Sequence, residues 1–158
     1  MHGLGRWRIG RRAALLAAAA LLLSCGRQQP DDTPEGVIRA WIDLMQRAQA
    51  DPGASLAAYD LLSRAAKENL QERARRATAA TGRLMPPEEM LVPSRFTLRF
   101  EPRQMKPRIA GDRALVEVTG ADPASEHASV PCVREDGHWR VDLMLPPLPE
   151  LERRPDPG

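Results

Sequence analysis

The chain is poor in the residues that most often carry chemistry. Two cysteines, three histidines and one tyrosine occur in 158 residues, and aromatic residues make up 4% of the sequence. The sequence lacks four common functional motifs: a CxxC pair, a G-x-S-x-G nucleophile elbow, a glycine-rich phosphate loop and a dinucleotide fingerprint. The chemistry that each motif supports depends on the backbone geometry of that motif. We therefore expect no catalytic residue, no metal site and no cofactor.

The chain also lacks an apolar run suited to permanent membrane insertion. The run from Ala13 to Leu23 spans eleven residues, whereas a transmembrane helix needs about 20 and the core of a signal peptide about 7–15. It follows a basic head that contains Arg11-Arg12. This arrangement predicts a cleaved export signal over residues 1–24. The general secretory route is favoured over a twin-arginine route because paired arginines are common in such heads.

The end of this run, Leu22-Leu23-Ser24-Cys25, has a bulky residue three positions before a cysteine and a small residue directly before it. It resembles the lipobox of bacterial lipoproteins. The resemblance implies cleavage before Cys25, a thioether-linked diacylglyceryl group on its sulfur and acylation of the new amino group, which together anchor a protein durably. The alternative is an ordinary secreted protein in which Cys25 is incidental.

We therefore expect a lipid-anchored protein of the bacterial cell envelope, with membrane lipid as its partner through Cys25. In lipoproteins of this kind the residue after the cysteine influences sorting, and Gly26 is compatible with the periplasmic side of an outer membrane. Without residues 1–24 the chain carries 19 basic and 21 acidic residues, so no basic excess favours a nucleic-acid partner. With Cys25 acylated, Cys132 is the one thiol left, which excludes an intramolecular disulfide.

The rest of the chain is long enough for one ordinary domain. We place the lipidated cysteine and an unstructured linker at residues 25–32 and the domain at residues 33–145. Residues 146–158 contain five prolines in thirteen positions, which predicts an extended, disordered tail.

Three helical segments are predicted in the first half of the domain. Thr33-Pro34-Glu35 has the hydroxyl cap, proline and acid of a helix start, and the helix is expected to run to about Gln49 with Val37, Trp41 and Met45 on one face. Asp51-Pro52-Gly53 is expected to end it. A second helix is predicted over residues 55–62, and a third over residues 64–80 between a Ser63 cap and Gly82.

The second half predicts an antiparallel sheet. Alternating apolar residues predict a half-buried strand from Arg95 to Glu101 and another over residues 113–119. Asp136-Gly137 predicts a two-residue hairpin turn that sets Cys132 opposite Val141 on the apolar face, so that Cys132 is a buried small side chain. The expected fold is α+β, with two to three N-terminal helices packed on a curved antiparallel sheet of four to five strands.

This order of elements, with the Thr33-Pro34-Glu35 start, residues 58–63, the strand entry at residues 111–114 and the closing residues 135–141, resembles small bacterial lipoproteins of the nuclear-transport-factor-two-like, cystatin-like cone superfamily. Its members include steroid isomerases, polyketide cyclases, dehydratases and exported domains without chemistry, so the fold leaves the function open. The resemblance implies that a ligand enters a cleft between the first helix and the concave sheet.

Four residues are candidates for such a pocket: Trp41, Tyr59, Asp60 and His127. Each also has a structural interpretation. Trp41 falls on the core-facing stripe of its helix, Tyr59-Asp60 can simply close a helix, and His127 lies at the entrance to a strand.

Three functions remain open from the sequence. The first is a non-enzymatic binding or accessory module of the envelope. The second is a small-molecule-binding protein or degenerate isomerase-like or dehydratase-like enzyme of the cone superfamily. The third is a structural lipoprotein that engages an envelope protein through its proline-rich tail. No sequence feature indicates the oligomeric state.

Overall fold

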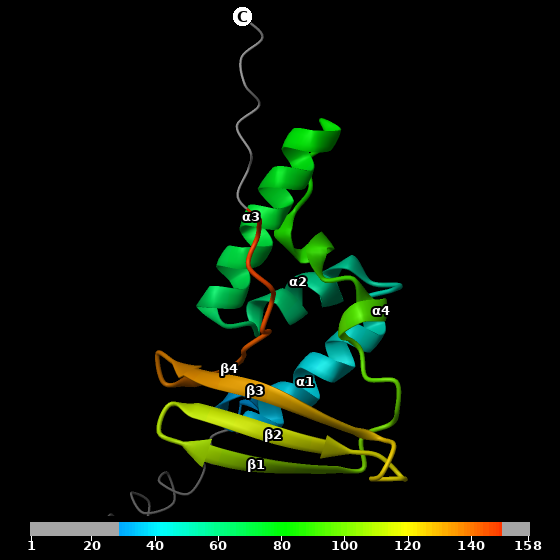
Figure 1. Ribbon diagram of the computed structural model, residues 1–158, viewed down its shortest axis with the longest axis vertical. Helices are drawn as coiled ribbons and strands as arrows, with labels where there is room; N and C mark the ends of the chain where they lie inside the picture. The colour runs from blue at the N-terminus through cyan, green and yellow to red at the C-terminus, as the bar shows by residue number, and fades with distance from the viewer. Residues whose placement is uncertain (1–28, 150–158) are drawn as a thin grey trace, which may run out of the picture.

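Helices precede the sheet along the chain, as the sequence predicts for an α+β domain. The computed structural model describes residues 29–149. Its helices are α1 (Pro34–Arg47), α2 (Pro52–Asp60), α3 (Arg64–Thr81) and the short α4 (Pro93–Phe96), and 3-10 turns form at η1 (Pro30–Asp32) and η2 (Pro87–Met90). The strands are β1 (Gln104–Ala110), β2 (Arg113–Thr119), β3 (His127–Glu135) and β4 (His138–Val141). Figure 1 shows α3 rising away from the sheet, while α1 lies across one face of it.

Side-chain caps fix where the three long helices begin. The Thr33 hydroxyl accepts the Gly36 N–H at the start of α1, and the Ser63 hydroxyl accepts the Ala66 N–H at the start of α3. Gly82 ends α3 with a left-handed φ of 71°, which glycine adopts without steric cost.

The second helix differs from its predicted bounds. Asp51 accepts the Gly53 N–H at 2.9 Å and Pro52 occupies the first turn, so Asp51-Pro52-Gly53 begins α2 instead of serving as a simple stop. The helix then ends at Asp60, not at Leu62.

The described strands form one antiparallel sheet in the order β1-β2-β3-β4. The predicted hairpin register is confirmed, with Cys132 opposite Val141 and a turn in which Asp136 and Gly137 both have positive φ. The ladder between β3 and β4 then stops. Asp142 donates its N–H to the Pro131 carbonyl at 2.9 Å, but Pro131 has no N–H to return the bond.

The strand predicted from Arg95 to Glu101 is wrong. Pro93 starts the four-residue α4, and the Thr97 hydroxyl bonds back to the Pro93 carbonyl at 2.8 Å, which closes the turn. The alternating Phe96, Leu98 and Phe100 are still half-buried against the core. They reach it from a helical turn and an irregular segment, because local proline chemistry overrides the period-two pattern.

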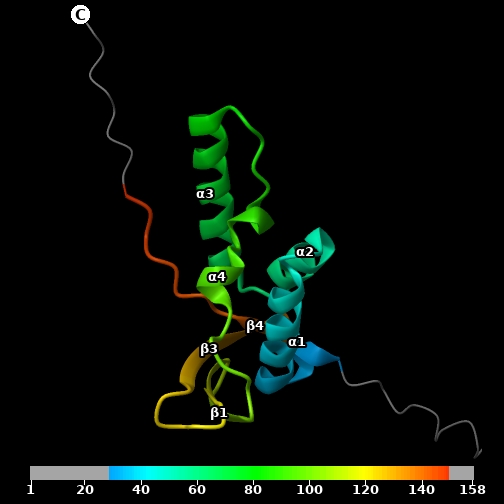
Figure 2. The ribbon, with the colours of Figure 1, turned by 90° about the vertical axis from the view of Figure 1, so that its right-hand side faces the viewer.

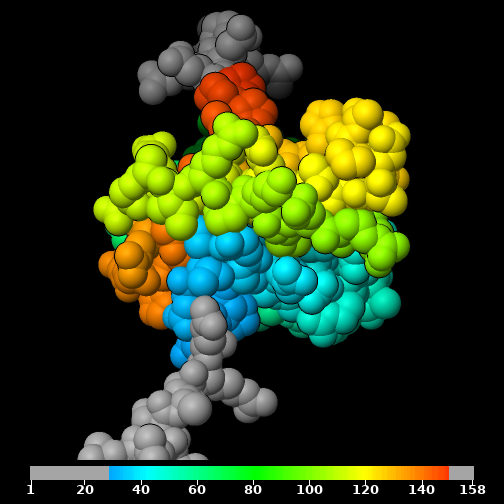
Figure 3. Space-filling model, turned by 90° about the horizontal axis from the view of Figure 1, so that it is seen from below, coloured from blue at the N-terminus to red at the C-terminus, as the bar shows by residue number. Residues whose placement is uncertain are grey.

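The core lies between α1 and the sheet. Val37, Ile38 and Met45 of α1 are fully buried, as are Val116 and Val118 of β2. Figure 2 shows α1 beside the sheet in a view along its layers, and Figure 3, seen from below, shows β1 in yellow-green lying against α1 in blue and cyan. The predicted core-facing stripe of the first helix is therefore confirmed.

Both ends of the described chain are attached to the domain. Pro30–Asp32, expected in the unstructured linker, form η1, where Asp31 accepts a hydrogen bond from Arg140 of β4. Pro146–Pro149, expected in the disordered tail, run beside α3 (Figure 2). The predicted signal over residues 1–24, the lipidation site Cys25 and residues 150–158 lie outside the described residues. Among residues 29–149, no helix has the length and apolar character needed to cross a bilayer.

Candidate binding groove

The four residues named as pocket candidates are not brought together. Trp41 and Tyr59 are 4% and 9% exposed and belong to the hydrophobic core. Burial raises the pKa of the Tyr59 phenol, and the Lys67 ammonium lies 5.6 Å from the centre of its ring. These two aromatic residues hold α1 and α2 in the core and line none of the cavities described below.

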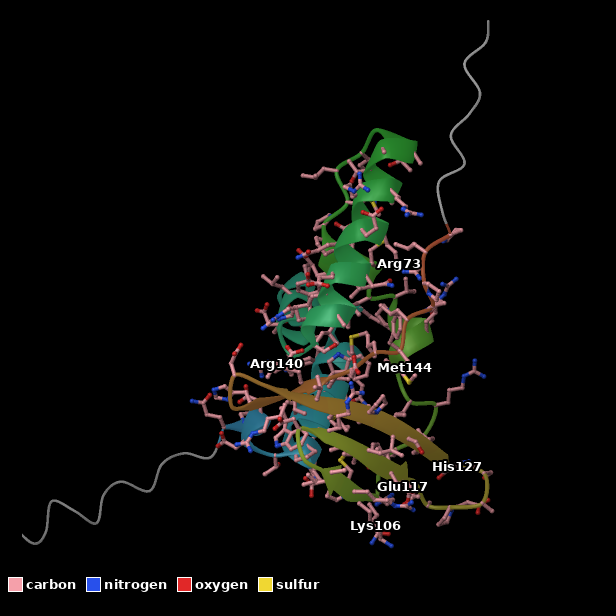
Figure 4. The ribbon with its side chains drawn as sticks, turned by 60° about the vertical axis from the view of Figure 1, so that its left-hand side comes forward. Arg73, Lys106, Glu117, His127, Arg140 and Met144 are labelled. Atoms are coloured by element: carbon pink, nitrogen blue, oxygen red, sulfur yellow. The ribbon has the colours of Figure 1, made fainter. Side chains whose placement is uncertain are left out.

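Asp60 and His127 lie on the surface. Asp60 is exposed at the end of α2, and its backbone carbonyl accepts a hydrogen bond from the Lys67 ammonium at 2.9 Å. His127 begins β3 opposite Thr119, which places it on the sheet face opposite the buried Val118. Figure 4 shows His127 at the far end of the sheet from Arg140. The structure therefore places two of these residues in the core and two on the surface.

The expected cleft between the first helix and the sheet is filled by side chains. Val37 and Met45 of α1 meet Val116 and Val118 of β2 with no exposed surface on any of the four. A cavity of about 220 Å³ remains at the rim, where Arg39 and Asp43 of α1 face Glu101 and Met105. Its mostly polar walls suit water and ions better than an apolar ligand.

A larger hollow lies beside α3, and we call it the α3–α4 groove. It has a volume of about 580 Å³ and is formed by α3, η2, α4 and the C-terminal segment, residues 142–149. Its apolar lining comprises Leu70, Met90, Val92, Phe96, Met144, Leu145, Pro146 and Leu148. Ligand pockets of about 300–1,000 Å³ with predominantly apolar walls are typical small-molecule sites.

The polar side chains that line the groove are all cationic. Arg73 and Arg76 come from successive turns of α3 and Arg95 comes from α4, and the lining includes no aspartate or glutamate. Arg76 is paired with Glu72 at 2.7 Å. Arg73 has no acidic partner within residues 29–149, and the Arg95 side chain forms neither a hydrogen bond nor an ion pair with that part of the chain.

Arginine side chains also hold the groove closed on one side. Arg73 donates from Nη2 to the Pro146 carbonyl at 2.8 Å, and Arg76 donates from Nη1 to the Pro149 carbonyl at 2.6 Å. Asn69 adds a bond of 3.3 Å to the same Pro146 oxygen. Pro146 and Pro149 lie beyond the last strand, β4, so their carbonyls have no partner in the sheet and are satisfied by the arginines of α3. Figure 4 shows Arg73 on the side of α3 that faces this segment.

Sequence reasoning missed this groove. The sequence predicts a disordered tail over residues 146–149 and assigns no binding role to Arg76. The groove walls come from segments far apart in the chain, and no periodic pattern links them. The one local signal is the set of apolar residues Leu145 and Leu148 among the prolines, which a solvated tail does not need.

A second polar cluster joins η1 to β4. Asp31, Asp32 and His138 bring oxygen and nitrogen atoms within 4.8 Å of one another, as metal ligands do. The Asp31 carboxylate, however, is bound by Arg140, and the Asp32 carboxylate accepts the Gln29 N–H at 2.6 Å. A guanidinium bound to one of the three residues repels a cation, so we interpret the cluster as a structural contact.

The N-terminal end of α3 is likewise occupied by the chain itself. The Arg64 N–H is 3.1 Å from both Glu135 carboxylate oxygens, and the buried Ser63 hydroxyl donates to Asp142 at 2.8 Å. Asp142 therefore supports the Ser63 cap. Glu135 accepts the Arg64 N–H, Asp142 accepts the Ser63 hydroxyl, and both negative charges lie at the positive end of the helix dipole.

Comparison with known proteins adds no relative: no family model, curated protein or solved structure matches this chain.

Proposed function

We propose that the chain is a lipid-anchored lipoprotein of the bacterial cell envelope whose domain is a non-enzymatic binding module. The observation that carries the binding role is the α3–α4 groove, which combines an apolar lining with an arginine rim. The groove offers no histidine, cysteine, serine or carboxylate at which acid–base or nucleophilic chemistry could begin. Its residues are suited to holding a molecule and not to transforming one.

The lipobox resemblance at Leu22 to Cys25 supports the anchor. On this proposal four residues separate the acylated cysteine from η1, which begins at Pro30. At roughly 3.3 Å per residue, four residues reach at most about 13 Å, so the domain lies close to the membrane surface.

A small-molecule-binding cone protein is the second candidate, and the groove favours it over a purely structural lipoprotein. A degenerate isomerase or dehydratase would need an acid or histidine facing an apolar pocket. The candidates Asp60 and His127 are both exposed and away from the groove.

Metabolic labelling with alkynyl palmitate tests the anchor, because the chain contains two cysteines and offers its own control. We expect label on the wild-type chain and on Cys132→Ala, and no label on Cys25→Ser. Globomycin should cause the unprocessed precursor to accumulate. Label that persists in Cys25→Ser, or a wild-type chain without label, contradicts the anchor.

A further inference from the structure

We propose that the α3–α4 groove binds a single-chain amphiphile that carries a phosphate head group. This inference rests on the proposed role as a binding module and adds the chemical class of the ligand. Three features carry it: the shape and lining of the groove, the charge at its rim and the exposure of its apolar wall.

The apolar half of the groove fits a flexible hydrocarbon chain. Met90 of η2, Phe96 of α4 and Met144 of the C-terminal segment all line it. Methionine side chains adapt to irregular apolar ligands because they are unbranched and polarizable. Val92 is 42% exposed and Met144 is 86% exposed, so apolar surface remains open to solvent where a bound chain would cover it.

The charged half of the groove fits an anion. Arg73, Arg76 and Arg95 line the same hollow without an acidic residue among the lining. Arg73 uses Nε and Nη2 for Asn69 and Pro146, which leaves Nη1 available. Arg95 has all five N–H donors unused within the described residues. A cavity lined by both apolar side chains and arginines is complementary to an amphiphile with an anionic head.

Phosphate fits this rim better than carboxylate does. A carboxylate has two oxygens and is satisfied by one bidentate arginine, whereas a phosphate ester presents up to three oxygens with more negative charge. Two helices contribute arginines to this groove, and arginine is favoured over lysine at phosphate sites because its planar fork can bind two oxygens at once. We therefore assign the rim to a phosphate monoester.

Photo-crosslinking tests the assignment with the protein anchored in a lipid bilayer. The acylated full chain is purified, placed in phosphatidylcholine nanodiscs and irradiated with three diazirine probes of equal chain length: a lysophosphatidic acid, a fatty acid and a fatty alcohol. Peptide mass spectrometry then locates the label. We expect the phosphate probe to label residues 90–96 and 143–148 about tenfold more than the alcohol does, as charge-assisted hydrogen bonds imply.

Surface variants separate the two halves of the groove. Arg95→Glu should reduce labelling by the phosphate probe about tenfold, whereas Arg95→Lys should retain part of it. Arg99→Glu, an exposed arginine three residues beyond α4, is the matched control and should label like wild type. Met144→Glu should reduce labelling by all three probes. Leu84→Glu is its control, because Leu84 is 81% exposed and lies outside the groove lining.

Each other outcome overturns the assignment. Equal labelling by the alcohol removes the anion preference, and stronger labelling by the fatty acid replaces phosphate with carboxylate. Groove labelling that appears only when residues 150–158 are deleted identifies the chain's own tail as the occupant. Absence of groove labelling with every probe removes the amphiphile itself. In all four cases palmitate labelling at Cys25 still decides the envelope anchor separately.

Discussion

The Asp31 carboxylate is hydrogen-bonded to the Arg140 guanidinium across 109 residues of chain. Asp31 lies in η1 at the start of the domain, and Arg140 lies in β4 at the end of the sheet. Their side chains are 15% and 22% exposed, so water screens the pair only in part. Through this contact the beginning of the domain is attached to its last strand.

Replacement of Asp31 should reduce both stability and its dependence on pH. Burial acts to raise the pKa of Asp31, but the hydrogen bond and charge of Arg140 outweigh it and leave the pKa below its usual value of 3.8. A lowered folded-state pKa gives stability that is complete above the usual value and is lost as pH falls through the lowered one. At pH 7, Asp31→Asn should lower the free energy of unfolding by about 1–2 kcal/mol.

Urea denaturation at pH 7 and at steps down to pH 3 measures this effect. The difference in unfolding free energy between wild type and Asp31→Asn should shrink as pH falls. Asp43→Asn, an exposed aspartate of α1 without an ion-pair partner in the described chain, should keep the wild-type profile. A constant difference at every pH would show that the charge of Asp31 is not what stabilises the contact.

The two core tryptophans should be costly to truncate. Trp41 and Trp139 are 4% and 5% exposed and belong to the same buried cluster. Trp41→Ala and Trp139→Ala should each lower the free energy of unfolding by about 3–5 kcal/mol, from lost burial and the cavity left behind. Chemical denaturation checks both, with Leu84→Ala as an exposed control that should stay near wild type. Wild-type midpoints for both tryptophan variants would contradict the core of α1 on the sheet.

Local signals predicted much of this fold because the groups that cause them are neighbours in the chain. Ser63 and Gly82 bound α3 through bonds and dihedral angles within a few residues, and Asp136-Gly137 fixes the hairpin register in the same way. The strand prediction from Arg95 to Glu101 failed for a different reason. Alternation shows which side chains are apolar, but it does not show whether a neighbouring strand is present to pair with the segment.

The α3–α4 groove could not be predicted from local sequence signals, because it depends on contacts between distant segments of the chain. Arg73 and Leu148 line the same hollow although they lie far apart in the chain. Whether a helix arginine faces water or a proline carbonyl depends on the path of the C-terminal segment, which no periodicity encodes. The burial of Cys132 was easier to predict, since the hairpin register alone places this residue on the buried face.

The Cys132 thiol should be unreactive in the folded protein. It is 2% exposed, and burial together with the charges of Asp142 and Glu35 raises its pKa to about 12. Alkylation requires the thiolate, so iodoacetamide at pH 8 should leave Cys132 unmodified and should modify it fully in guanidinium chloride. Peptide mass spectrometry gives the result, and an introduced Ser94→Cys on the exposed start of α4 is the reactive control. Rapid native labelling of Cys132 would contradict its burial.

The contact between α3 and the C-terminal segment should depend on Arg73. Its Nη2 holds the Pro146 carbonyl at 2.8 Å, and the Asn69 bond to the same oxygen is longer, at 3.3 Å. Arg73→Gln shortens the side chain and removes the charge, so the segment should detach more often while the core stays folded, because Arg73 is not part of the core cluster. Limited proteolysis with proteinase K should then cut residues 142–149 several times faster, with an unchanged thermal midpoint.

Arg75→Gln is the matched control, because Arg75 lies on the same helix and pairs only with Glu72 among the described residues. Equal cleavage rates in the two variants would mean that Arg73 is not what keeps the segment on α3, which leaves the Arg76 bond to Pro149 and the apolar contacts of Leu145 and Leu148.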